Sequence, residues 1–188
     1  MKLQYFGDSY DIVKKALIAW LGEFGDWAAH PMFTEAVSHE RIEMFSRFLG
    51  ARLLSTEILT PKTDRATYLA PCQSVGNLFL DPDTGVRLQA RDDAKSVDYV
   101  FGQELVVLSR ARPMALTMVF DQSYSRGDQK SQIQEKLSSL GSQGVHGFAY
   151  CSHAPFLILS VDAKLVRRAY SSLLKASGLP SWRLITTA

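Results

Sequence analysis

Short, continuous apolar runs alternate along this chain with segments whose apolar residues recur at helical spacing. Runs at residues 27–30, 78–80 and 116–120 do not alternate with polar residues, which is typical of strands buried on both faces of a parallel sheet. The segments between them begin at a capping residue and end at glycine or proline, as amphipathic helices do. The pattern predicts helices with apolar faces over residues 12–21, 42–49, 101–108, 133–140 and 165–174.

The order of these elements predicts the fold class. A first strand is expected at residues 3–7, with Ser9 as the cap of the helix that follows, while residues 52–76 carry no clear pattern. Near the C-terminus, residues 145–151 and 156–161 read as strands joined by so short a link that they must pair antiparallel. Alternating strands and helices predict an α/β fold with three layers: a Rossmann-like, mostly parallel sheet, helices on both faces and a C-terminal antiparallel hairpin at one edge.

Composition narrows the class of protein only modestly. A length of 188 residues, 46% of them hydrophobic, predicts one domain over residues 1–188 with a sizeable core. A net charge of +2 permits a nucleic-acid or nucleotide partner without requiring one. Cys72 and Cys151 lack zinc or disulfide spacing, which favours a reduced, cytoplasmic protein. No segment approaches the roughly 18 apolar residues of a membrane span, so no membrane association is expected, and the oligomeric state stays open, a homodimer included.

Four aspartates follow the predicted strands directly and give the strongest candidate for a site: Asp8, Asp81, Asp83 and Asp121. Right-handed crossovers put the carboxyl ends of parallel strands on one rim, where α/β proteins bind their ligands. Carboxylate oxygens are the ligands that Mg²⁺ and Mn²⁺ prefer, and such ions promote phosphoryl displacement. We therefore predict a metal site made by these four aspartates, with Asp81 and Asp83 also catalytic.

Three further side chains complete this hypothesis. His153, in the link of the hairpin, is a candidate general acid or base. Arg126 and Ser123 lie in a polar segment after the run at 116–120 and are candidates for binding the substrate, the arginine by neutralising a phosphate. The predicted function is that of a divalent-metal-dependent phosphoesterase, such as a nuclease. The alternative is a non-catalytic interaction module, because aspartates are also ordinary capping and turn residues.

Several short motifs resemble a set of uncharacterised bacterial and phage proteins. They are the segments Tyr-Phe-Gly-Asp-Ser-Tyr-Asp at 5–11, His-Pro-Met-Phe-Thr at 30–34, Asp-Pro-Asp-Thr-Gly at 81–85 and Phe-Asp-Gln-Ser at 120–123. This resemblance spans most of the chain and implies no function. A Walker P-loop, a Gly-x-Gly-x-x-Gly loop and a Gly-x-Ser-x-Gly elbow are all missing from the sequence.

The central motif, residues 81–85, also resembles parts of two functional families. It is similar to the Asp-Pro-Asp metal motif of toprim nucleases and topoisomerases, although this chain has Gly7-Asp8 where that family has a glutamate. It is also similar to the fourth motif of Rossmann-type methyltransferases, including the three-Cys-motif partner proteins, and the closing hairpin at 145–161 resembles the end of that fold. The second resemblance implies S-adenosylmethionine as cofactor, although no glycine-rich loop follows the first strand.

Overall fold

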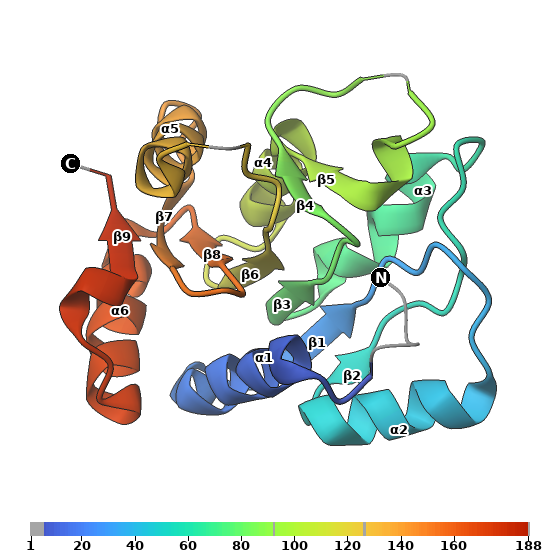
Figure 1. Ribbon diagram of the computed structural model, residues 1–188, viewed down its shortest axis with the longest axis horizontal. Helices are drawn as coiled ribbons and strands as arrows, with labels where there is room; N and C mark the ends of the chain where they lie inside the picture. The colour runs from blue at the N-terminus through green and yellow to red at the C-terminus, as the bar shows by residue number, and fades with distance from the viewer. Residues whose placement is uncertain (1–5, 92, 126, 188) are drawn as a thin grey trace.

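A seven-stranded sheet forms the middle layer of the molecule (Figure 1). The computed structural model describes residues 6–91, 93–125 and 127–187. The strand order is β2-β1-β3-β6-β8-β7-β9, and β2, β1, β3 and β6 pair in parallel. The strands are β1 Trp27–His30, β2 Arg52–Leu53, β3 Asn77–Leu80, β6 Thr117–Phe120, β7 His146–Tyr150, β8 Phe156–Ser160 and β9 Leu184–Thr186.

Helices cover both faces of this sheet, which confirms the predicted three-layer α/β fold (Figure 1). One face carries α1 Ser9–Trp20, α2 His39–Leu49 and α6 Ala163–Ser177, and the other carries α3 Arg65–Leu69, α4 Gly102–Ala111 and α5 Gln129–Gly141. Four short 3₁₀ turns link these elements: η2 Gly22–Phe24, η3 Ala70–Ser74, η4 Ser96–Asp98 and η5 Ser181–Arg183.

The core is divided by the sheet because neighbouring residues of a strand point to opposite faces. In β3, Phe79 packs among the side chains under α1, α2 and α6, whereas Leu78 and Leu80 pack on the side of α3, α4 and α5. All three are fully buried. A strand that is apolar on both faces therefore reads as a continuous apolar run, which is the pattern that predicted it.

The predicted helix ends are mostly confirmed. Ser38 caps α2 by accepting a hydrogen bond from the backbone of Arg41, and Gly50 ends it in the left-handed conformation at φ 68°. Asp162 caps α6, which Gly178 ends at φ 64°. The cap of α1 is Asp8 rather than the predicted Ser9, because the Asp8 carboxylate accepts hydrogen bonds from two backbone N–H groups of the first turn.

Other boundaries differ from the prediction. Of the expected first strand, residues 3–5 lie outside the described residues, and Phe6 and Gly7 form a turn. The stretch expected to be a loop, residues 86–96, begins instead with β4 Gly85–Arg87. This strand pairs in parallel with β5 Tyr99–Phe101, and the pair lies beside the main sheet. The region at 52–76 contributes β2, α3 and η3.

The hairpin has the predicted antiparallel pairing but another position in the sheet. Strand β8 pairs antiparallel with both β6 and β7, so it lies inside the sheet, and β9 forms the edge. Pairing with β6 buries β8 completely, which explains why the run at 156–160 is apolar throughout. No helix among the described residues has the length and apolar character needed to cross a membrane.

Candidate functional site

The first predicted site residue, Asp81, follows β3 and is held by a lysine of α1. Lys14 Nζ donates to Asp81 Oδ2 at 2.8 Å and to Asp11 Oδ1 at 2.9 Å. All three side chains are buried, with Asp81 only 1% exposed. Burial acts to lower the pKa of Lys14, but the two carboxylates outweigh it and raise the pKa above its ordinary value, so the ammonium stays charged.

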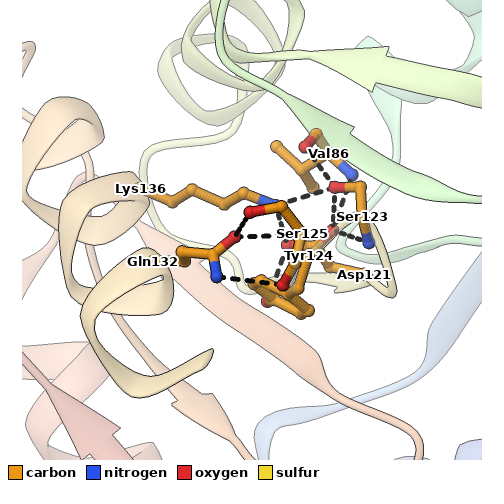
Figure 2. A network of polar contacts seen from close by, with 7 residues as sticks. All are labelled: Val86, Asp121, Ser123, Tyr124, Ser125, Gln132 and Lys136. Carbon is orange, nitrogen blue, oxygen red and sulfur yellow. Dashed lines mark hydrogen bonds and ion pairs between the residues drawn. The ribbon is translucent and has the colours of Figure 1, made fainter. Parts of the chain in front are cut away.

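The second predicted carboxylate, Asp121, lies at the end of β6 in a network of donors (Figure 2). Lys136 Nζ of α5 donates to Oδ2 at 2.7 Å, and the Tyr124 hydroxyl donates to the same oxygen at 2.8 Å. The backbone N–H groups of Val86 and Ser123 donate to Oδ1 at 2.9 and 3.1 Å. Because Asp121 is 0% exposed, these donors replace the water that its carboxylate would otherwise bind.

The four aspartates share the carboxyl rim but do not form one cluster. Asp8 accepts from the backbone N–H groups of Tyr10 and Asp11 as the cap of α1, and Asp83 is half-buried in the turn after β3. Across the described residues, no three His, Cys, Asp or Glu side chains lie close enough together to hold a metal ion. An Mg²⁺ ion needs carboxylate oxygens, and at Asp81 and Asp121 a lysine ammonium already takes that place.

His153 does lie in a group of polar side chains from distant parts of the chain. Its Nε2 is 3.1 Å from the Ser9 hydroxyl, and its ring packs edge-on against Tyr10 at 5.2 Å. The Gln122 amide donates to both the Tyr10 hydroxyl, at 2.7 Å, and the His153 carbonyl, at 2.9 Å. Gln122 therefore connects the start of α1, the segment after β6 and the link between β7 and β8.

A cavity of about 330 Å³, here called the rim pocket, opens at the carboxyl end of β6. Gln122 belongs to its wall, so the rim pocket adjoins the group around His153. On the opposite wall, the Arg87 guanidinium lies 3.9 Å from the centre of the Tyr99 ring and pairs with Asp93 at 3.1 Å. The lining comprises Thr84, Val86, Arg87, Tyr99 and residues 122–125.

The two predicted substrate-binding residues have different outcomes. Ser123 lines the rim pocket, but its hydroxyl already contacts the Val86 carbonyl, an Asp121 oxygen and Lys136 Nζ at 2.6, 2.6 and 2.7 Å. With its Cβ, these partners surround the oxygen, so the hydroxyl is positioned to shape the wall rather than to react. Arg126 lies outside the described residues.

Close packing keeps the carboxylate network in place. Gly85 has φ +142°, and a Cβ there would lie 2.8 Å from Asp121 Cα and would collide with the Asp121 carboxylate. Only glycine allows β4 to approach β6 this closely. The glycine of the Asp-Pro-Asp-Thr-Gly motif is thus explained by contact with the neighbouring carboxylate.

Two lysines are among the site residues that the sequence did not predict, Lys14 and Lys136. A signal existed: Lys14 precedes the buried Leu17 by three positions, and Lys136 is three positions after Ile133 and four before Leu140. A lysine at helical spacing within an apolar face is unusual, because lysine is rarely buried without a partner. Each of these lysines identifies one aspartate of the rim as its partner.

The arrangement offers hydrogen-bond donors, a guanidinium on an aromatic ring, and a histidine, all at the rim where α/β proteins bind ligands. Comparison with family models, with curated proteins and with solved structures finds no match to this chain. This result is consistent with the resemblance to uncharacterised bacterial and phage proteins, and the toprim and methyltransferase similarities rest on their short motifs alone.

Proposed function

We propose that this chain binds a nucleotide-type phosphoester in the rim pocket. The observation that carries the proposal is the position of Arg87 against Tyr99 in a cavity at the carboxyl end of a buried strand. Because the guanidinium covers one face of the Tyr99 ring, a base would stack on the guanidinium plane, while its N–H groups bind phosphate oxygens in pairs. The cavity volume of about 330 Å³ falls within the range of small-molecule sites, which is roughly 300–1,000 Å³.

The electrostatics beneath the pocket favour an anionic ligand. Asp121 would repel a phosphate, but Lys136 neutralises it at 2.7 Å and the other donors to Asp121 hold it in place. Among the described residues, the ion-pair partner of Arg87 is Asp93, whose side chain is 42% exposed. Such a surface pair is worth at most about 1 kcal/mol, so a phosphate can take the place of Asp93 on the guanidinium.

The proposed reaction is hydrolysis of the bound phosphoester with His153 as the acid–base group. Gln122, in the pocket wall, donates to the His153 carbonyl, and this link between the pocket and the segment of His153 supports its role. Mg²⁺ is commonly bound by substrate phosphates together with one or two carboxylates, so Mg²⁺ or Mn²⁺ would enter with the ligand. Of the predicted ligands, Asp8 and Asp83 are half-buried, whereas Asp81 and Asp121 are buried against their lysines.

Calorimetric titration with AMP and ATP, each with and without Mg²⁺, tests binding. Arg87→Met should weaken binding at least about tenfold, the loss expected for one charged hydrogen-bonding group. Asp93→Asn is the matched control: it frees Arg87 from its ion pair, so binding should stay equal or become tighter. Equal affinity in the wild type and Arg87→Met would remove the proposal.

Hydrolysis is measured separately with p-nitrophenyl phosphate and a short oligonucleotide. His153→Gln should lower turnover by about 100-fold or more while leaving affinity unchanged, since general acid–base catalysis contributes that much. Ser152→Ala, in the same link, is the control, because its hydroxyl bonds only locally to Ala154. Binding of the phosphoester without its hydrolysis would support the proposed ligand and would refute the proposed reaction.

A second candidate, binding of S-adenosylmethionine, is favoured by one topological feature. Strand β8 runs antiparallel between β6 and β7, which agrees with the predicted resemblance of the closing hairpin to methyltransferases. A ligand that binds only the native state raises apparent stability. A thermal shift with S-adenosylmethionine that survives Arg87→Met would favour this candidate over the nucleotide proposal.

A further inference from the structure

A second cavity, here called the edge pocket, lies at the opposite end of the sheet from the rim. Its volume is about 410 Å³, and its walls come from α5, α6, β7 and the end of β9. Strand β9 pairs with β7 only at Phe148–Tyr150, so the first residues of β7, His146 and Gly147, extend beyond it and border the cavity. In Figure 1, α5 and α6 flank this edge of the sheet from its two faces.

The edge pocket has an apolar floor. Leu137 comes from α5, Phe148 from β7 and Val166 from α6, and all three are buried. The Tyr170 ring packs edge-on against Phe148 at 5.4 Å and extends the apolar wall. A floor of this kind favours binding of apolar ligand surface, because covering that surface removes it from water.

Two polar groups beside this floor are available to a ligand. Arg167 and the Tyr170 hydroxyl make no ion pair or hydrogen bond to any residue that the structure describes. The basic side chains of Arg167 and His146 line the cavity, and none of its described lining residues is an aspartate or glutamate. By contrast, the rim pocket's arginine already has an acidic partner, Asp93.

We infer that the edge pocket binds a small amphipathic carboxylate, with its apolar body on the floor and its carboxylate on Arg167. The charge of the lining selects the acid over a neutral molecule of the same shape, because a carboxylate forms paired, charge-assisted hydrogen bonds with a guanidinium. The cavity is separate from the rim, so this site is independent of the proposed phosphoester site.

Calorimetric titration with octanoate and with octan-1-ol tests the inference, because the two share an apolar chain and differ in charge. Octanoate should bind about tenfold more tightly than octanol, and Arg167→Gln should abolish that difference without affecting octanol. The matched control is Arg168→Gln, the next residue of α6, whose guanidinium lies over the Phe24 ring outside the pocket. It should leave both affinities unchanged.

A third variant, Ser171→Phe, fills the pocket from its exposed wall and should abolish binding of both ligands. Equal affinity for octanoate and octanol in the wild type would overturn the inference, as would equal losses in Arg167→Gln and Arg168→Gln. The other possible occupant of the pocket is a second copy of the chain, which sedimentation velocity tests. If the protein is a dimer that Ser171→Phe dissociates and octanoate does not, the pocket is a dimer interface and the inference is overturned.

Discussion

The two buried lysine–aspartate pairs follow neighbouring strands of the sheet, yet their surroundings differ. Lys14 is shared by two carboxylates, Asp81 and Asp11, and holds α1 against the end of β3. Lys136 serves one carboxylate, Asp121, whose other partners are neutral donors. The first pair is therefore a link between a helix and the sheet, whereas the second orders the segment that forms the wall of the rim pocket.

The difference also appears in the charge of each lysine. Two carboxylates raise the pKa of Lys14 despite its burial. Burial lowers the pKa of Lys136, and Asp121, with a smaller contribution from Glu135, offsets only part of that effect. The comparison shows that the same pair of residue types contributes to stability in one place and to the shape of a site in another, depending on how many charges share the ammonium.

The largest expected effect comes from removing the cation of the first pair. Lys14→Met leaves Asp81 and Asp11 buried without their counter-ion, which should lower the free energy of unfolding by about 4 kcal/mol, as for other broken buried pairs. Urea denaturation measures this loss. Lys15→Met is the control, because Lys15 is exposed and lies over the Phe48 ring.

A double variant separates charge from packing at the same place. Lys14→Met with Asp81→Asn removes both charges of the ion pair and should recover about half of the lost stability, because only Asp11 then stays without its counter-ion and it still accepts from the Gly7 N–H. A loss below about 1 kcal/mol in Lys14→Met alone would contradict the distinction between the two pairs.

A smaller effect is expected at the second pair. Lys136→Met leaves Asp121 with the Val86 and Ser123 N–H groups and the Tyr124 hydroxyl, so the loss should be about 2 kcal/mol, the cost of one unsatisfied buried partner. The folded variant should also bind AMP more weakly in the rim pocket, by more than the fraction of unfolded protein accounts for. Calorimetry on the folded variant measures this.

The matched control for that variant is Lys130→Met, an exposed lysine in the first turn of α5. It should change neither stability nor affinity. If Lys136→Met were as destabilising as Lys14→Met, the second pair would be a structural link like the first.

Much of the fold was predictable because its signals are local. Continuous apolar runs identify strands that are buried on both faces, and Ser38, Gly50 and Asp162 mark helix ends by their own backbone chemistry. The position of β8 was not predictable in this way. Its partners β6 and β7 are chosen by long-range pairing, and the apolar run at 156–160 is equally compatible with an edge or an interior place.

The sequence predicted where the aspartates of the site lie, but not which side chains they contact. Asp81 and Asp121 do lie at the carboxyl rim, as their position after apolar runs indicated. Lys14 is distant in sequence from Asp81, and Lys136 lies in a helix that follows the loop after Asp121. A lysine in a helix is normally expected to be exposed. Arg87 was missed because its strand, β4, lies in a stretch that reads as a loop, and Tyr99 because β5 lies where the sequence predicts the start of a helix.

The smallest expected effect is a difference in pH dependence between the two pairs. In the folded protein the pKa of Lys136 is below 10.5, so just below pH 10.5 the unfolded chain binds more protons and stability rises with pH. The pKa of Lys14 is above 10.5, so its contribution is constant up to pH 10.5 and is lost only as pH rises through the higher value.

Urea denaturation between about pH 8.5 and pH 10.5 separates the two lysines. The stability of the wild type relative to Lys136→Met should increase over this window, because the folded chain has already lost the proton that the unfolded chain still binds. Relative to the double variant of Lys14 and Asp81, it should stay constant, because the raised pKa of Lys14 keeps its ammonium charged over this window. A decrease relative to Lys136→Met would mean that Asp121 outweighs burial. The two lysines would then be equivalent in charge, and only the number of carboxylates around each would distinguish the pairs.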